Sequence, residues 1–114
     1  LNLYNSIDIC LDTFPYNGVT TSFEALWMGV PILTMKGYNF NSRCGESINK
    51  NLNLSSMIAN DENDYISKAK EFLDKEKIVN TRNVVFDNLL KSPLFDGKKF
   101  SKEFLGSLEA IYNK

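Results

Sequence analysis

The sequence predicts half of an open α/β domain, with two or three parallel strands followed by a helix-rich carboxyl-terminal part. An apolar run at residues 7–11 has the length and residue types of a buried strand. Apolar residues at helical spacing come next: Phe23, Leu26, Trp27 and Val30. A second apolar run occupies residues 31–35. A strand, a helix and a strand over so few residues are typical of a right-handed βαβ unit, in which the two strands are parallel.

The other elements of the first half follow in order. We expect residues 1–4 to end a helix that begins earlier in a longer chain, because the sequence starts abruptly and without Met. Gly29 is placed to stop the first helix in the left-handed conformation. Residues 42–51 are expected to be helical, and residues 57–59 to form a very short edge strand. A sheet this small is poorly stable alone, so further strands are expected from an upstream region or a partner chain.

The second half is predicted to contain only helices. One helix is expected at residues 60–73 and another at residues 75–90, which Ser92 and Pro93 end because the residue before proline disfavours helix. The helix at residues 75–90 is expected to have an apolar side formed by Val79, Phe86 and Leu90, with Val85 and Leu89 beside them. Asp96 is a suitable N-cap for a last helix, whose regularly spaced apolar residues we expect in the core: Phe100, Phe104, Leu108 and Ile111.

Size and composition indicate one globular domain over residues 1–114. The hydrophobic fraction is 43% and the formal net charge is −1. This charge argues against nucleic acid as the main partner, because binding to phosphates by counterion release needs a basic surface. No apolar run approaches the length that spans a membrane. The sequence has no histidine, which excludes histidine-based acid–base catalysis and a Ser-His-Asp triad made by this chain alone.

Cysteine usage favours a cytoplasmic protein. Cys10 falls within the first predicted strand and Cys44 within a predicted helix. Two isolated cysteines have neither the spacing of a metal site nor the number of a disulfide framework. We therefore expect both to be reduced thiols, as is usual in the cytosol, and we expect no metal site.

The turn between the first strand and the first helix is the candidate functional site. Ligands of open α/β sheets bind beyond the carboxyl ends of the strands, and free N–H groups at a helix start attract anions. Gly18 would allow close approach of the backbone, and Thr20 and Thr21 add hydroxyl donors. The alternative is structural: Thr21 and Glu24 match a capping box, in which each side chain satisfies the other's backbone N–H. The residues alone favour this capping interpretation.

Three charged residues near this turn each have two interpretations. Glu24 could accept hydrogen bonds from ribose hydroxyls, or complete the capping box. Asp12 could be a functional acid at the end of the first strand, but local hydrogen bonds to turn amides are favoured. Arg43 could clamp an anion with both of its terminal nitrogens, although a surface ion pair is equally expected.

A resemblance to a known family adds to this interpretation. Residues 8–31, DICLDTFPYNGVTTSFEALWMGVP, closely resemble the O-GlcNAc transferase/SPINDLY-like glycosyltransferases. Further similarity lies at Ser42-Arg43 with Gly45 and Ser47, at residues 54–59 and at residues 92–96, SPLFD. The resemblance implies a GT-B architecture, in which a nucleotide sugar binds between two Rossmann-like lobes. This chain would be the carboxyl-terminal half of the second lobe.

The resemblance also implies the reaction and the residues. It implies transfer of a sugar, GlcNAc, from UDP-GlcNAc to a Ser or Thr hydroxyl of a protein, with inversion and without a metal or other cofactor. The residues that would wrap the diphosphate are Gly18, Val19, Thr20 and Thr21. Glu24 would hold the ribose, and no residue of this chain is assigned as catalytic.

The sequence departs from the family in two places. Val19 stands where animal members have a histidine, so only its backbone N–H could reach a phosphate. Glu24 stands where animal members have aspartate. The family's uracil-binding segment, a phosphate-contacting lysine, the first lobe and the helical repeats that hold protein acceptors would all lie upstream. The chain alone is therefore expected to be inactive. Two alternatives stay open: the same scaffold with GDP-fucose or another donor, and a non-catalytic sugar-nucleotide-binding or interaction module.

Overall fold

The computed structural model describes residues 2–114 and contains a three-stranded parallel sheet in the order β1-β2-β3. Its strands and helices are β1 (Cys10–Leu11), α1 (Thr20–Trp27), β2 (Ile32–Met35), α2 (Cys44–Asn51), β3 (Ile58–Ala59), α3 (Glu62–Glu71), α4 (Lys75–Leu89) and α5 (Gly97–Tyr112). The predicted βαβ unit and the short third strand are confirmed. Residue 1 lies outside the described part, and Asn2–Ser6 form a 3₁₀ turn instead of the end of an α-helix.

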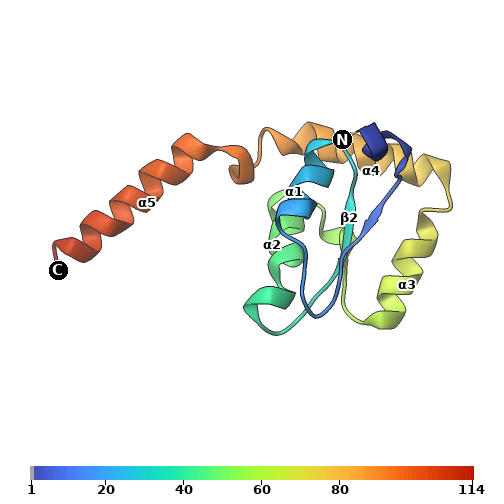
Figure 1. The fold of residues 1–114 in the computed structure, drawn as a ribbon, viewed down its shortest axis with the longest axis horizontal. Coiled ribbons are helices and arrows are strands. Elements are labelled where there is room, and N and C mark those ends of the chain that lie inside the picture. The colour runs from blue at the N-terminus through green and yellow to red at the C-terminus, as the bar shows by residue number, and fades with distance from the viewer. Residues whose placement is uncertain (1) are drawn as a thin grey trace.

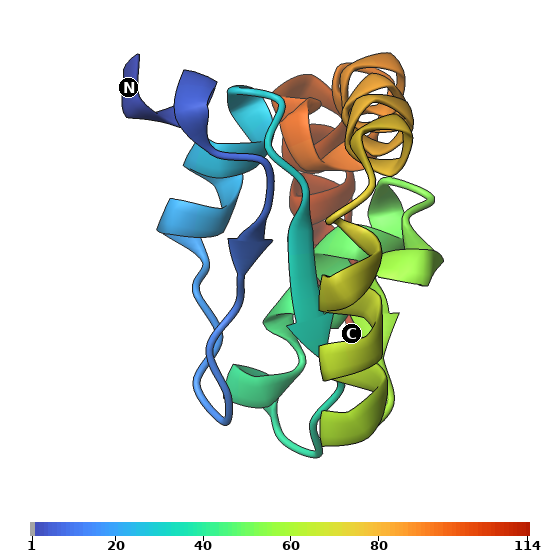
Figure 2. The same ribbon diagram turned by 90° about the vertical axis from the view of Figure 1, so that its right-hand side faces the viewer.

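The helices form layers around the sheet. Figure 1 shows α1 and α2 on one side of β2 and α3 on the other, with α4 across the amino ends of the strands. Figure 2 shows the strands running in the same direction, away from α4. The loops that follow the strands therefore gather at the edge of the sheet opposite α4. This edge is where open α/β domains bind their ligands.

The first strand is shorter than the sequence predicted. Cys10 pairs with Ile32 and Leu11 with Leu33, so residues 7–9 would have to pair with residues 29–31. Pairing fails there for two reasons: Gly29 is in a left-handed turn with φ +78°, as predicted, and Pro31 has no N–H to donate. The first inter-strand bond is instead from the Cys10 N–H to the Pro31 carbonyl, at 2.9 Å.

The second helix also begins later than predicted, at Cys44 instead of Ser42. Ser42 belongs to a preceding 3₁₀ turn, Phe40–Ser42, which Asn39 caps through a reciprocal pair of hydrogen bonds. The Asn39 side chain satisfies the Ser42 N–H, so this residue is a cap partner and not the first residue of the α-helix.

The core lies between the sheet and the helices on both of its faces. The largest apolar side chains that are buried completely belong to Leu26, Leu33, Leu52, Met57, Val30 and Val85. Complete burial of one such side chain contributes about 1.5–3 kcal/mol to folding. In α4 the buried face is Thr81, Val85 and Leu89, whereas the residues expected on that side are more than half exposed: Val79, Phe86 and Leu90. The apolar stripe predicted for this helix was therefore rotated from the observed one.

Helix α5 extends away from the body of the molecule (Figure 1). The Asp96 carboxylate caps it as predicted, accepting a hydrogen bond of 3.0 Å from the Lys99 N–H. The prediction that its apolar residues lie in the core was wrong, because no residue of α5 is buried. Phe100 and Phe104 stack on each other with ring centroids 5.6 Å apart and remain more than half exposed.

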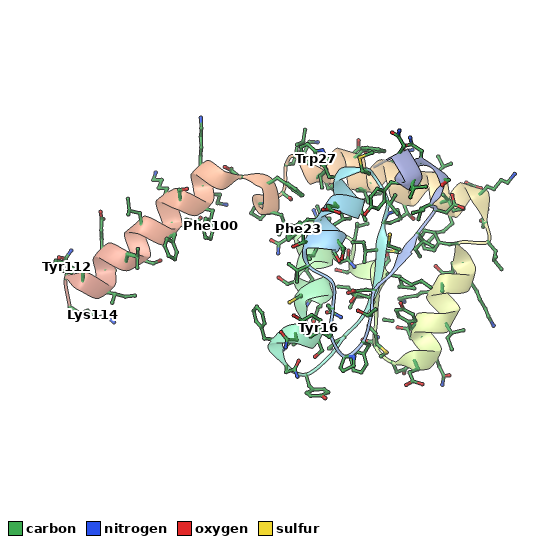
Figure 3. All side chains as sticks on the ribbon, in the orientation of Figure 1. Tyr16, Phe23, Trp27, Phe100, Tyr112 and Lys114 are labelled. Atoms are coloured by element: carbon green, nitrogen blue, oxygen red, sulfur yellow. The ribbon has the colours of Figure 1, made fainter. Side chains whose placement is uncertain are left out.

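The segment before α5 is attached to α1 by aromatic contacts. The Phe95 ring lies 5.7 Å from the Phe23 ring and 5.5 Å from the Trp27 ring, measured between centroids. Figure 3 shows Phe23 and Trp27 on the part of α1 that is next to this segment. Among residues 2–114, no helix combines the length and the apolar character that are needed to cross a membrane.

We predict that Gly29→Ala lowers the free energy of unfolding by about 1–3 kcal/mol, because an alanine is strained at positive φ. A methyl group there would also lie 2.2 Å from the Phe86 ring, which must move. Gly106→Ala is the matched control, since Gly106 is inside α5 with nothing within 4 Å of the added methyl. This control is expected to be stabilising by about 0.5–1 kcal/mol. Equal effects of the two substitutions in urea unfolding would contradict the assignment.

Candidate functional site

The loop between β1 and α1, residues 12–19, lies at the predicted edge of the sheet. It leaves the carboxyl end of β1, extends past the strands and turns back into α1 (Figure 2). Tyr16, labelled in Figure 3, is exposed at the far end of this loop. The structure thus brings Gly18, Val19, Thr20 and Thr21 together at the start of α1, with Glu24 one turn further along.

Helix α1 starts without a side-chain cap. Its N-cap is Val19, and no side chain caps the first turn. The predicted capping box of Thr21 and Glu24 was therefore wrong. The physical reason is that the chain enters the helix two residues earlier than the box requires, so Thr21 already has a helical conformation and cannot act as a cap.

The first amides of α1 are available to a ligand. The first helical hydrogen bond is from the Phe23 N–H to the Val19 carbonyl, at 3.0 Å. Within residues 2–114, the N–H groups of Val19, Thr20 and Thr21 have no hydrogen-bond partner, and all three residues are exposed. Unpaired donors and the positive end of the helix dipole make this a suitable place for an anion.

Gly18 has a structural role in the loop. Its N–H is not free, because it donates a hydrogen bond of 2.9 Å to the Asp12 carboxylate. A Cβ on Gly18 would lie 2.7 Å from the Thr21 hydroxyl and 3.1 Å from the Ser22 hydroxyl. Its lack of a side chain thus allows the loop to pack against the first turn of α1.

Asp12 holds this loop from inside. Its Oδ1 accepts hydrogen bonds from the Gly18 N–H and, at 3.0 Å, from the Thr13 N–H. Its Oδ2 accepts a hydrogen bond of 2.8 Å from the Thr34 hydroxyl. Burial raises the pKa of the Asp12 carboxyl above 3.8, although these hydrogen bonds oppose the rise. The structural interpretation of Asp12, hydrogen bonds to turn amides, is therefore confirmed.

Glu24 lies one turn into α1, and Arg43 lines the same hollow as Val19 at the start of that helix. Glu24 is exposed, and its carboxylate makes no hydrogen bond with residues 2–114. Arg43 forms the ion pair expected from the sequence, with 3.1 Å between its Nε and Oε2 of the buried Glu46. A hydrogen bond from Lys50, followed by the contacts with Arg43, lowers the pKa of Glu46 against the effect of burial.

Two hollows flank the start of α1. One, of about 430 Å³, has a mainly apolar wall formed by Val19, Phe23, Phe40, Ile48 and Leu94, with Arg43, Cys44 and Ser47 beside it. The other, of about 210 Å³, is lined by Gly18, Thr21 and Ser22 together with residues of β1 and its flanks. The start of α1 therefore lies between two recesses and is not packed shut by its own chain.

Sequence reasoning missed Asn17, the one buried residue of the loop. Its exposed fraction is 1%, and its Oδ1 accepts a hydrogen bond of 3.0 Å from the Gly45 N–H at the start of α2. An Asn-Gly pair is a signal for a turn, but it does not tell which segment the Asn side chain will bind.

Comparison with known proteins identifies the family. The model of glycosyl transferase family 41 matches residues 5–104. The chain belongs to this family. Among its relatives, a probable UDP-N-acetylglucosamine–peptide N-acetylglucosaminyltransferase SPINDLY from Solanum lycopersicum is 38% identical over 98% of this chain. A UDP-N-acetylglucosamine–peptide N-acetylglucosaminyltransferase from Caenorhabditis elegans is 34% identical over 94% of it.

A solved O-GlcNAc transferase structure has the same fold. A mutant O-GlcNAc transferase from Thermobaculum terrenum superimposes with a TM-score of 0.89 over 97% of this chain, at 31% identity. The predicted Rossmann-like fold, as a carboxyl-terminal part of a GT-B glycosyltransferase, is confirmed by this match. The chain covers 22% of that structure and 12% of the Solanum relative.

The raised pKa of Asp12 predicts how the stability of the fold depends on pH. The folded state holds this proton more tightly than the unfolded state, whose pKa is near 3.8. The contribution of Asp12 to the free energy of unfolding is thus fully present below pH 3.8 and decreases as the pH rises through the folded pKa. Asp12→Asn can keep the hydrogen bond from the Gly18 N–H but cannot titrate.

We therefore expect the advantage of wild type over Asp12→Asn in urea unfolding to decrease above pH 3.8. Asp64→Asn is the control of opposite sign, because hydrogen bonds from the Asn60 N–H and Lys68 lower the pKa of Asp64. Its effect is expected to change below pH 3.8, with wild type losing its advantage as the pH falls. A constant difference between wild type and Asp12→Asn would show that this carboxyl has no raised pKa.

Proposed function

We propose that this chain provides the diphosphate-binding part of the donor site in a glycosyltransferase that moves GlcNAc from UDP-GlcNAc to Ser or Thr hydroxyls of proteins. The observation that carries the proposal is the start of α1, where the amides of Val19, Thr20 and Thr21 are unpaired and exposed at the ligand-binding edge of the sheet. Membership of family 41, and relatives named as UDP-N-acetylglucosamine–peptide N-acetylglucosaminyltransferases, support the choice of donor and acceptor.

In this proposal the start of α1 acts on the leaving group. The acceptor oxygen attacks the anomeric carbon from the face opposite the diphosphate, the bond from that carbon to the phosphate oxygen breaks, and the configuration inverts. Negative charge accumulates on the diphosphate as this bond breaks. Amides, hydroxyls and the helix dipole that are already oriented toward it stabilise that charge, and a metal ion is not required for this role.

Each residue at the start of α1 would contact a different part of the donor. The hydroxyls of Thr20 and Thr21 would donate to the phosphate oxygens, while Val19 would contribute its backbone N–H alone. Glu24, exposed one turn along α1, would accept hydrogen bonds from the ribose hydroxyls. Its carboxylate must turn aside from the phosphates, since like charges repel. Gly18 would support the loop, because Asp12 already occupies its N–H.

Other parts of a longer protein would complete the site. The chain corresponds to about an eighth of its SPINDLY relative, 12% of that length. Recognition of the base, the acceptor protein and the group that takes the acceptor proton are assigned to those parts, so we propose that this chain alone is inactive. We also propose a cytoplasmic location, supported by the two cysteines, Cys10 and Cys44, which are free thiols.

The proposal predicts that a Thr20→Ala/Thr21→Ala double variant of the full-length protein loses transfer of labelled GlcNAc. Each hydrogen bond to a charged group contributes about 1.5–3 kcal/mol, so kcat/KM is expected to decrease by roughly 100-fold or more. Ser101→Ala/Ser107→Ala is the matched control, since it removes two exposed hydroxyls from α5, far from the loop.

Three outcomes would contradict this function. Unchanged transfer by the threonine double variant would remove the assigned role of the hydroxyls. Transfer from GDP-fucose but not from UDP-GlcNAc by the wild-type protein would replace the donor. Binding of UDP-GlcNAc without any transfer to protein would favour a non-catalytic sugar-nucleotide-binding module.

A further inference from the structure

Asn17 is unusual because it is buried in a loop whose other side chains are mostly exposed. Thr13, Phe14, Pro15 and Tyr16 before it are exposed, whereas the exposed fraction of Asn17 is 1%. A buried amide side chain is unfavourable unless its polar atoms are paired. Its pairing partners therefore indicate what the residue does.

Each polar group of Asn17 binds a different segment. Its backbone N–H donates to the Asn41 carbonyl at 2.9 Å, in the loop after β2. Its Nδ2 donates to the Thr13 carbonyl at 2.8 Å, across its own loop. Its Oδ1 accepts from the Gly45 N–H at 3.0 Å, in the first turn of α2. Asn17 thus connects the loop before α1 to the two segments beside it.

The glycine at position 45 makes this connection possible. A Cβ on Gly45 would lie 2.2 Å from the Thr34 hydroxyl and 2.5 Å from Oδ2 of Asp12. Any side chain there would push the start of α2 away from the strand ends. Because glycine has no side chain, the Gly45 N–H can reach the Asn17 side chain. The Asp12 carboxylate, which also binds the loop, lies next to the same glycine.

These contacts determine which amides stay free. The Gly18 N–H donates to the Asp12 carboxylate, and the Asn17 N–H donates to the Asn41 carbonyl. The backbone N–H groups of both residues before Val19 are therefore paired within the protein. The chain then enters α1 with Val19 as its N-cap, and the N–H groups of Val19, Thr20 and Thr21 have no partner among residues 2–114. Without the side chain of Asn17, the loop would lose its attachment to α2 and its internal bond to Thr13.

We propose that Asn17 is a positioning residue for the donor site, one that sets the direction of the Val19, Thr20 and Thr21 amides without contacting the ligand. This inference rests on the function proposed above. It assigns to the start of α2 a role in donor affinity, because Gly45 is the partner of the Asn17 side chain.

The test is Asn17→Ala in the full-length protein, with steady-state kinetics measured for both substrates. Loss of the buried hydrogen bonds should weaken donor binding, so the KM for UDP-GlcNAc is expected to rise on the order of tenfold. The KM for the acceptor is expected to stay at its wild-type value. A merely structural role would instead reduce the amount of active enzyme, which lowers the apparent kcat and leaves both KM values unchanged.

Asn49→Ala is the matched control. Asn49 is 0% exposed, and its Nδ2 donates to the carbonyls of Ile32 and Met57, away from the loop. This substitution also removes buried hydrogen bonds, so the melting temperature is expected to fall while both KM values stay unchanged. An equal rise in the donor KM for both variants would overturn the proposal.

A second variant covers the case in which Asn17→Ala does not fold. Asn17→Asp keeps an acceptor for the Gly45 N–H but cannot donate to the Thr13 carbonyl and adds a negative charge behind the phosphate site. Its donor KM is also expected to rise, and a wild-type value would overturn the inference. Thr20→Ala/Thr21→Ala in the same assay separates the two proposals: if only that variant loses activity, the donor site stands and the role of Asn17 fails.

Discussion

The hydrogen bond from the Gly18 N–H to the Asp12 carboxylate is the constraint on which the candidate site depends. This bond closes the loop after β1 between Asp12 and Gly18. The Asp12 side chain cannot move freely, because its other oxygen accepts a hydrogen bond from the Thr34 hydroxyl. The chain must therefore enter α1 at Val19, and the helix begins with amides that no other group of residues 2–114 binds.

This arrangement places a carboxylate behind a site proposed for a diphosphate, which has an electrostatic cost. Three hydrogen bonds to the carboxylate, from the Gly18 and Thr13 N–H groups and the Thr34 hydroxyl, stabilise its charge and reduce this cost. The helix start contributes in the opposite direction, by about 0.3–1 kcal/mol for one charge at an exposed end and up to about 2 kcal/mol where it is partly buried. In addition to the effect of the helix dipole, the unpaired amides can donate hydrogen bonds directly to the phosphates.

The sequence alone predicted the βαβ unit, the left-handed Gly29, the short third strand and the Asp96 cap, because each depends on residues that are close in the chain. Two errors come from local hydrogen bonds that the residue pattern does not reveal. The helix starts assumed at Thr21 and Ser42 are displaced where the Gly18 N–H binds Asp12 and the Ser42 N–H binds Asn39. Other errors concern contacts between distant segments, because the apolar face of α5 is not buried by any other part of residues 2–114. Asn17 was missed for the same reason, since its side chain binds the start of α2. The family resemblance pointed to this loop but did not indicate what orients it.

The most direct measurement is an NMR titration of the full-length protein, labelled with ¹⁵N at Val and Thr only, with UDP as the ligand. We expect the amide signals of Val19, Thr20 and Thr21 to shift as UDP binds, and those of Thr81 and Val84 in α4 to stay in place. UDP binding that leaves the Val19, Thr20 and Thr21 signals unchanged would contradict the account.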